Sequence, residues 1–313
     1  MDMGFILSKL MMMFAAILAS FVAVKKGLWG KEGNLVFSKA VTYVLNPATI
    51  LASTMTGERP LSNSQVLILV AIAFACYAFL IASSFLIPKI LRVKADKERI
   101  YRFMYIFSNV GFFGLPVVRA LFGASAAFLV VIYILPFQTL TFTYGVILMA
   151  KGQDGVKLSP KMLLHPMILS CVAALILYLC KVQVPDLVKE PLNFLGDATS
   201  PLAMMVVGGS LAFTPLKSVF HNWRLYALTA IKSFVVPVLV LFTLKAILPQ
   251  TESYRLMIGV SAIIMSMPVA AVSTILANQY NQDVTIPASG VCLSTLCSVV
   301  SIPFVMWLLN TVL

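Results

Sequence analysis

The stretch SNVGFFGLPVVRALFG, residues 108–123, decides how this chain folds, because it interrupts an otherwise apolar segment of membrane-spanning length. Gly111 and Gly114 make the backbone permissive, and Pro116 lacks an amide hydrogen and clashes with the preceding turn of a helix. Asn109 adds a polar side chain at the start of the interruption. The stretch therefore predicts a helix that is broken into two half-helices joined by a short extended segment.

A second stretch in the other half of the chain, residues 261–280, has the same character. Ser266 and Pro268 interrupt an apolar segment there. Three pairs of landmarks have nearly the same offset, close to half the chain length: YRFM at 101–104 and YRLM at 254–257, Pro116 and Pro268, and Pro47 and Pro201. Repeated landmarks at one offset indicate two copies of one unit. We therefore expect an internal duplication.

The composition is that of a membrane protein. Of the 313 residues, 60% are hydrophobic and 11% are charged, and the mean hydropathy is +0.98. A membrane-spanning helix needs about 20 mostly apolar residues. Ten runs are predicted to span the bilayer: 5–24, 36–56, 66–88, 101–122, 125–149, 163–180, 193–213, 223–248, 254–277 and 285–312. The sequence thus predicts an all-α polytopic membrane protein with no room for a soluble catalytic domain.

Basic residues are concentrated in alternate loops. Most of the 23 Lys and Arg residues lie in or beside the loops 25–39, 89–102, 151–161 and 217–224. Such loops are cytoplasmic by the positive-inside rule, which leaves both termini extracellular. Because each copy holds five spans, an odd number, the second copy enters the membrane from the opposite face. The expected domains are a first five-helix repeat at 1–150, a cytoplasmic connecting loop at 151–161 and a second, inverted repeat at 162–313.

Interrupted segments at matching positions of two halves are typical of secondary transporters. In hydrocarbon, broken backbone is tolerated only where it is buried in protein or lines a wet cavity. Half-helices that begin near Pro116 and Pro268 would point free N–H groups and positive dipole ends at this cavity. The arrangement predicts a binding site for an anion, with Gly111 and Gly114 at the first interruption.

Neutral polar side chains near the interruptions are candidates for contact with the anion. Asn109 can donate to a carboxylate and also satisfy free backbone groups, so a purely structural amide is the alternative. Asn46 precedes Pro47 in the second span, and it either lines the cavity or belongs to a kinked packing helix. Ser266 is the polar side chain nearest to Pro268.

Ionisable residues within predicted spans are functional candidates by default. Arg119, about one turn beyond Pro116, either complements the anion or reaches the outer membrane interface. Asp197 is a candidate for a coupling proton, or it caps the outer end of its span. Lys232 is a counter-charge candidate, unless its side chain extends to the cytoplasmic interface. A polar stripe in the fifth span, which includes Gln138, either faces the cavity or packs between helices.

At the two interruptions the sequence resembles the auxin efflux carrier family, which includes bacterial malate and malonate permeases and the plant PIN-FORMED carriers. The resemblance rests on Asn109, Gly114, Leu115, Pro116, Gly123, Pro268, Ala277, Tyr280, Asn281, Ser289 and Pro303. It implies ten helices in two inverted repeats, with the fourth and ninth spans crossing at mid-membrane. It also implies a homodimer formed through spans one, two, six and seven, and an elevator-like displacement of the other spans.

The resemblance further implies a small organic anion as substrate. Malate, malonate, a related carboxylate or an auxin-like weak acid would bind at the crossing, against Asn109 and the half-helix ends. The chain lacks the long central loop of the plant members, so it is similar to the bacterial branch in the plasma membrane. It departs from the family pattern at the second interruption, because no asparagine precedes Pro268. This departure weakens the hypothesis that two asparagines form the site.

Other functions fit the sequence less well. A cation/proton antiporter or sodium-coupled symporter of related fold would carry acidic residues near the crossing, and neither interruption contains Asp or Glu. An intramembrane enzyme would need a catalytic motif such as HExxH, which the chain lacks. The sequence is also compatible with a receptor or a channel, and with either a proton or a sodium ion as the coupling ion.

Nucleic acid, cofactor and metal are not expected. The net charge of +12 comes from basic residues in alternate short loops rather than on one face. No GxxxxGK[ST] run is present to hold a nucleotide. The five cysteines match no metal-ligand spacing.

Overall fold

The computed structural model describes residues 3–55, 59–150, 164–214 and 222–313, which form helices and short connections. The first half contains α1 (Met3–Lys25), α2 (Lys31–Ala40), α3 (Asn46–Ala52), α4 (Asn63–Ser83), α5 (Ile87–Ile90), α6 (Glu98–Ile106), α7 (Leu115–Phe122), α8 (Ala127–Leu140) and α9 (Val146–Ala150). The second half contains α10 (Pro166–Leu179), α11 (Asp186–Ala212), α13 (Trp223–Ala230), α14 (Val236–Ile247), α15 (Glu252–Met265), α16 (Val272–Gln279) and α17 (Thr285–Val312). The prediction of an all-helical fold is confirmed for these ranges. The predicted connecting loop 151–161 lies outside them.

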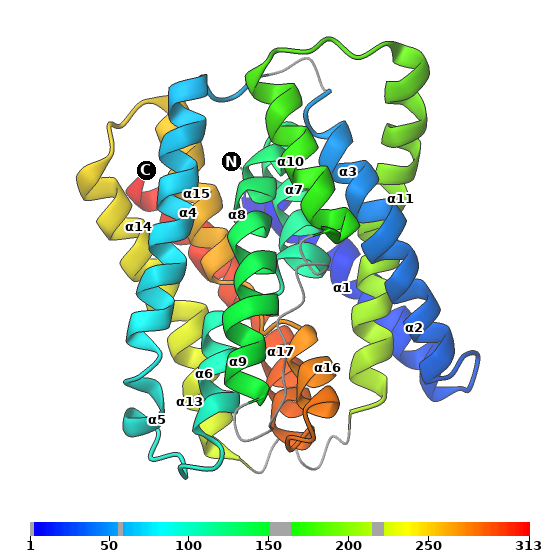
Figure 1. The fold of residues 1–313 in the computed structure, drawn as a ribbon, viewed down its shortest axis with the longest axis vertical. Helices are drawn as coiled ribbons and strands as arrows, with labels where there is room; N and C mark the ends of the chain where they lie inside the picture. Colours follow the sequence, from blue (N-terminus) through cyan, green and yellow to red (C-terminus); the bar gives the residue numbers. More distant parts are fainter. Residues whose placement is uncertain (1–2, 56–58, 151–163, 215–221) are drawn as a thin grey trace.

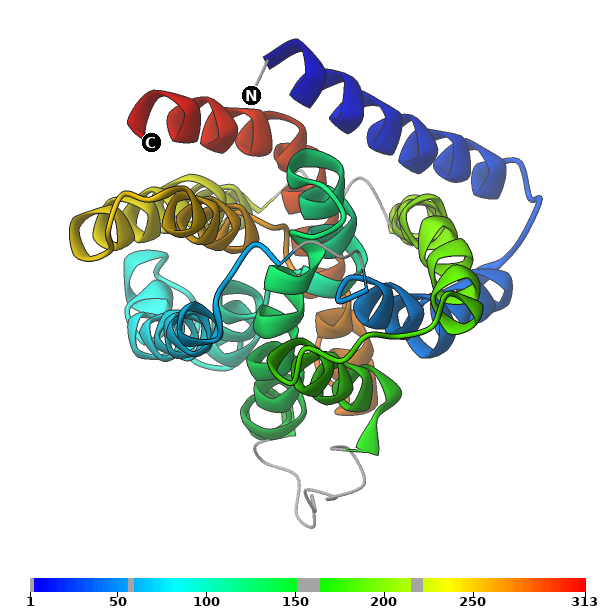
Figure 2. The same cartoon turned by 90° about the horizontal axis from the view of Figure 1, so that it is seen from above.

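The helices pack side by side, with α8 and α9 passing through the middle (Figure 1). On one side α11 packs against α1 and α3, and on the other side α4 packs against α8 while α14 packs against α15. Seen from above, α1 lies along one edge of the bundle (Figure 2). The short helix α5 and the start of α6 lie at the opposite end of the bundle from α10 and the end of α3, so the basic loop 89–102 is at one end.

Wide π-helical turns interrupt several helices: η1 (Val41–Leu45), η2 (Val110–Gly114), η3 (Thr141–Gly145) and η5 (Ile231–Val235). Three of these four turns are followed two residues later by a proline: Pro47, Pro116 and Pro237. A proline ring clashes with the carbonyl four residues before it, and a wider turn moves that carbonyl away. The prolines therefore explain where the helices widen, and such turns often lie at functional sites.

Large apolar side chains cover much of the outer surface. Met11, Leu67, Phe194 and Ile247 are all strongly exposed, as expected for side chains that contact lipid. By length and composition, six segments of the described chain could cross a membrane: Leu7–Lys25, Lys31–Ala52, Asn63–Ser83, Ala127–Ala150, Trp223–Ile247 and Thr285–Val312. Every predicted span falls on helices, although the ten-span inverted repeat stays a prediction.

Candidate functional site

The two interruptions predicted from the sequence meet in the interior. Helix α6 ends at Ile106 and helix α15 ends at Met265, and the extended segments that follow run antiparallel to each other. The N–H of Asn109 donates to the carbonyl of Pro268 at 2.7 Å, and the N–H of Ala270 donates to the carbonyl of Phe107 at 3.0 Å. The predicted meeting of the two broken segments is thus confirmed, and two backbone hydrogen bonds hold them together.

Asn109 begins the half-helix after the first interruption. Its side-chain oxygen accepts from the N–H of Phe112 at 3.2 Å, and its carbonyl accepts from Phe113 and Gly114. The structural role suggested for this amide is therefore present. The prediction that the half-helix begins near Pro116 is wrong, since the helix resumes at Val110. The wide turn η2 places Pro116 inside the helix, where its missing N–H removes one hydrogen bond.

Gly114 lets the second broken segment approach closely. A Cβ atom at this position would lie 2.9 Å from the Cδ1 atom of Ile264 and 3.5 Å from the Cγ atom of Met267. Contacts under 3 Å do not occur between real Cβ atoms and their neighbours. Glycine therefore lets η2 pack closely against the end of α15, where a larger residue would have to displace the end of the Ile264 side chain.

The polar side chains at the second interruption are paired within the protein. The hydroxyl of Ser266 donates to the carbonyl of Ile263, in the last turn of α15, at 2.8 Å. The N–H of Val269 donates to the hydroxyl of Ser294 on α17 at 3.0 Å. The helix resumes at Val272 and not near Pro268, so the predicted start is wrong here too. Ser266 is thus committed to its own helix end, and the first N–H groups of α16, those of Ala271 and Val272, lie beyond Pro268.

Asn46 lies at the junction of η1 and α3 and is fully buried, yet neither its side-chain nitrogen nor its oxygen has a hydrogen-bond partner. Its Nδ2 atom lies 3.6 Å from the position of a Cβ atom on Gly111. The backbone N–H of Gly111, in the first turn of η2, likewise has no hydrogen-bond acceptor among the described residues. Buried polar side chains nearly always have partners, so the unpaired amide of Asn46, beside the first-turn N–H of Gly111, is a candidate contact for a ligand.

Gln138 on α8 borders the same region. Its amide nitrogen donates to the sulfur of Met167 on α10, which also lies 3.9 Å from the Cβ position of Gly111. A thioether is a weak acceptor, so this buried amide is only poorly satisfied. The side chains of Asn46 on α3 and Met167 on α10 therefore lie beside Gly111, and Gln138 on α8 adjoins Met167.

Lys232 lies on η5 and is buried, with its Nζ atom donating to the carbonyl of Tyr105 at 2.7 Å. Tyr105 belongs to the last turn of α6, directly before the first interruption. A cation at the carboxyl end of a half-helix compensates the negative end of its dipole. The alternative that Lys232 extends to the cytoplasmic interface is therefore wrong, because its ammonium group reaches inward.

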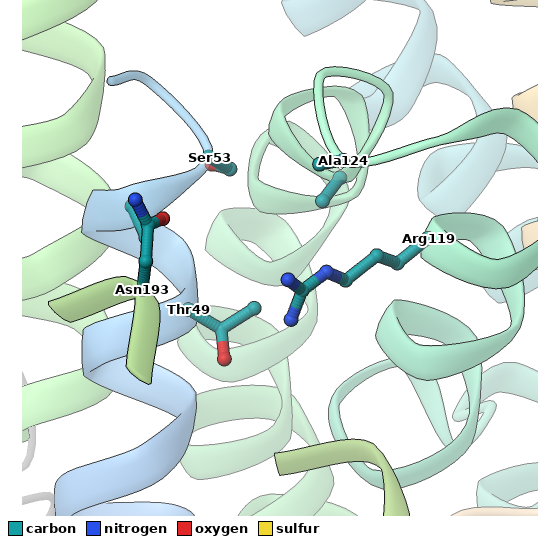
Figure 3. A pocket seen from close by; sticks show the side chains of 7 residues that line it. Thr49, Ser53, Arg119, Ala124 and Asn193 are labelled. Atoms are coloured by element: carbon teal, nitrogen blue, oxygen red, sulfur yellow. The ribbon is translucent and has the colours of Figure 1, made fainter. Parts of the chain in front are cut away.

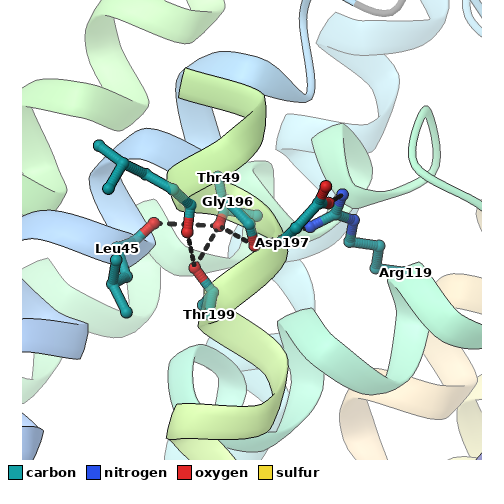
Figure 4. A network of polar contacts seen from close by, with 7 residues as sticks. Leu45, Thr49, Arg119, Gly196, Asp197 and Thr199 are labelled. Carbon is teal, nitrogen blue, oxygen red and sulfur yellow. Dashed lines mark hydrogen bonds and ion pairs between the residues drawn. The ribbon is translucent and has the colours of Figure 1, made fainter. Parts of the chain in front are cut away.

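Arg119 connects α7 to α11. Its Nη2 atom forms an ion pair with the carboxylate of Asp197, and its Nη1 atom donates to the carbonyl of Gly196 at 2.8 Å (Figure 4). The same carbonyl accepts from the hydroxyl of Thr49 on α3, and that hydroxyl lies 2.7 Å from the hydroxyl of Thr199. Asp197 is 70% exposed, so it does not lie deep within the bundle.

A pocket opens beside this ion pair. It is a shallow opening between α3, the segment that joins α7 to α8, and α11, with about 220 Å³ of empty space when open solvent is counted and enclosed room for about one water molecule. The guanidinium group of Arg119 points into it, toward Thr49 and Asn193 (Figure 3). Arg119 is therefore assigned to this pocket by its contacts, and none of its hydrogen bonds reaches Asn109.

The loop before the first broken segment also contacts the loop that follows the second. Lys97, just before α6, donates to the carboxylate of Asp283, between α16 and α17, at 3.2 Å. Partial burial alone would raise the pKa of Asp283, but the hydrogen bonds from Lys97 and Thr285 hold this pKa below its usual value. The two interruptions are thus connected at the basic end of the bundle as well as at their crossing.

Comparison with known proteins identifies the family. The family model described as membrane transport protein matches residues 5–162 and 156–306. The chain belongs to this family. It is the family that contains the auxin efflux carriers, so the resemblance predicted from the sequence is confirmed. An uncharacterized transporter of Methanocaldococcus jannaschii is 27% identical over 303 residues, which cover 94% of this chain and 95% of that protein.

As a membrane transport protein, this chain is a multi-pass membrane protein. Of the predicted site residues, the structure brings Asn46, Gly111 and Asn109 to the first interruption and separates Arg119 and Asp197 from them. Two polar residues of these regions were not among the predicted site residues. Gln138 was visible only as part of a polar stripe, and Asn193 has a single signal, which is its spacing of one helical turn from Asp197.

Proposed function

We propose that this protein is a secondary transporter, or permease, that carries small organic anions such as malate, malonate or related carboxylates across the cell membrane. The observation that carries the proposal is the buried, unpaired amide of Asn46 beside the free N–H of Gly111. A carboxylate between them would accept hydrogen bonds from both groups. It would also lie at the positive end of the half-helix Val110–Phe122, which favours negative charge.

The chemistry of the neighbouring side chains supports an anion. Asn46, Gln138 and Met167 are neutral, and two of them carry amide N–H donors. A hydrogen bond from an amide to a carboxylate is stronger than one to a neutral acceptor. We expect Gln138 to exchange its weak contact with Met167 for the second half of a bound carboxylate group.

For the mechanism we propose two inverted five-helix repeats and an elevator-like displacement. The hydrogen bonds between the two interruptions support this, because they would make the crossing segments move as one unit. The stationary part would consist of α1, α2, α3, α10 and α11, and it would form a homodimer in the bilayer. We place the basic loops in the cytoplasm and both termini outside.

A coupling proton or sodium ion belongs to the same proposal. Half-helix carboxyl ends bind coupled cations in several transporters. Here the ammonium group of Lys232 occupies the carboxyl end of α6, where it acts as a fixed counter-charge for the anion. Asp197 remains a candidate for binding a coupling proton. If transport by Asp197→Asn depends on a proton gradient as strongly as transport by the wild type, this role is excluded.

The proposal is tested by counterflow. Purified protein in liposomes should take up labelled malate or malonate, saturably and faster when unlabelled substrate is inside. A valine at Gly114 would push against Ile264, so Gly114→Val should abolish counterflow. Gly30→Ala is the matched control, because a Cβ atom there meets no other atom within 4 Å. No uptake of any small carboxylate by folded protein, with imposed proton or sodium gradients, would contradict the proposal.

A further inference from the structure

The pocket beside Arg119 has the features of a second anion site. Its walls come from α3, α7, α11 and the start of α8, and Arg119, Asn193, Thr49 and Ser53 supply its polar side chains (Figure 3). The other lining residues are the alanines Ala52, Ala124 and Ala127, and a ligand would fit by taking the place of the Asp197 carboxylate at the mouth. None of these residues belongs to the crossing of the two interruptions.

Hydrogen-bond donors in the pocket remain unused. A guanidinium group has five N–H donors, and Arg119 uses two of its nitrogens, one toward Asp197 and one toward Gly196. The amide of Asn193 has no partner among the described residues. The hydroxyls of Thr49 and Ser53 already donate to backbone carbonyls. The available donors are therefore a cation and an amide on opposite walls, which suit a carboxylate group.

The partner that Arg119 now has is easily exchanged. The side chain of Asp197 is 70% exposed, so water reaches its carboxylate and weakens its hold on Arg119, which is itself only 24% exposed. Asn193 and Asp197 are four residues apart on α11, so they lie on the same face, one turn from each other. A carboxylate bound between Arg119 and Asn193 would therefore sit directly beside Asp197 and could replace it on the guanidinium group.

We propose that this pocket is an outer binding site for a small carboxylate, in which the ligand displaces Asp197 from Arg119 and is held by Arg119 and Asn193. The inference rests on the proposed function in one respect, namely that the ligand is the same class of anion as the transported one. It assigns Arg119 to a site separate from the crossing. Asp197 is a competitor of the ligand there.

Equilibrium binding of labelled malonate and malate to the full chain in lipid nanodiscs tests this proposal. The wild type should bind about two carboxylates per chain, and Arg119→Gln should lose one of them, because a charged donor is worth tenfold or more in affinity. Asp197→Asn should tighten the outer site by roughly two- to fivefold, since the competing charge is gone. A merely structural ion pair would not produce this tightening.

Further variants separate the two sites. Should Arg119→Gln fail to fold, Asn193→Ala removes a neutral donor, and we expect it to weaken the outer site by roughly two- to tenfold. Asn46→Leu should remove only the site at the crossing.

If Asn46→Leu removes all binding while Arg119→Gln and Asp197→Asn change nothing, the outer site is refuted and the proposed function stands. If Arg119→Gln alone removes all binding, the crossing site is refuted. Absence of binding of both probes to the wild type refutes both sites.

Discussion

The two interruptions have similar sequences, yet they differ in how their polar groups are satisfied. At the second, the hydroxyl of Ser266 donates within its own helix end and the hydroxyl of Ser294 accepts from the extended segment, so the polar side chains there are paired. At the first, the partners come from distant helices: Lys232 binds the end of α6, and the unpaired amide of Asn46 lies beside Gly111. Under the proposed function, the first interruption binds the ligand and the second supports it.

The largest expected effect is that of Asn46→Leu. Because the amide is buried without a partner, its loss should not destabilise the protein, and a similarly sized apolar side chain should raise the melting temperature slightly. Carboxylate affinity at the crossing should fall about ten- to hundredfold. Counterflow kinetics and thermal unfolding measure both.

The control for that variant is Asn34→Leu. Asn34 is also buried, but its Nδ2 atom donates to the carbonyl of Val206 and the hydroxyl of Ser210 on α11. Its loss should lower the melting temperature and leave the affinity unchanged. Equal affinity losses in the two variants would mean that a buried asparagine matters only for folding.

Gly111→Ala should have the next largest effect. The added methyl group would lie 3.4 Å from Met167 and 3.6 Å from Asn46, which the fold tolerates, but it would occupy the place of the ligand. We expect roughly tenfold weaker binding with the fold retained. Gly259→Ala makes an equally close contact, with Phe122, away from the site and should bind normally. Normal binding by Gly111→Ala would move the ligand elsewhere.

Asn109→Ala should act mainly on stability. Removing the hydrogen bond from the N–H of Phe112 eliminates a helix cap, which costs about 0.5–2 kcal/mol. Asn109→Ser can restore the cap, so it should recover most of the melting temperature. Chemical denaturation in detergent measures the difference. An Asn109→Ala variant as stable as the wild type would show that the cap contributes little.

The smallest effects are expected at the second interruption. Ser266→Ala and Ser294→Ala each remove one hydrogen bond, worth about 0.5–1.5 kcal/mol of stability. Neither should change carboxylate affinity, because each hydroxyl is already hydrogen-bonded to the backbone of the second segment. A selective loss of affinity in Ser266→Ala would overturn the difference between the two regions.

Local sequence patterns predicted both interruptions, since proline and glycine act on the backbone where they stand. The same patterns misplaced the starts of the half-helices, because the wide turn η2 accommodates Pro116 within a helix. A sequence pattern also locates polar residues in spans, as it did for Asn46 and Lys232.

Tertiary contacts were beyond this kind of prediction. Arg119 and Asp197 are 78 residues apart, and Lys232 and Tyr105 are 127 residues apart. Which side chains meet depends on how helices from both halves pack, and local patterns in one sequence do not reveal that packing. For the same reason the role of Gln138 became visible only when α8 was placed beside α10.

The most direct test of the central claim is an electron cryo-microscopy structure of the protein in nanodiscs with the carboxylate that gives counterflow. The account predicts density for the anion between the N–H of Gly111 and the amide of Asn46, within hydrogen-bond distance of both. Density against Ser266 and Val269, with Asn46 unchanged and the first interruption empty, would contradict it.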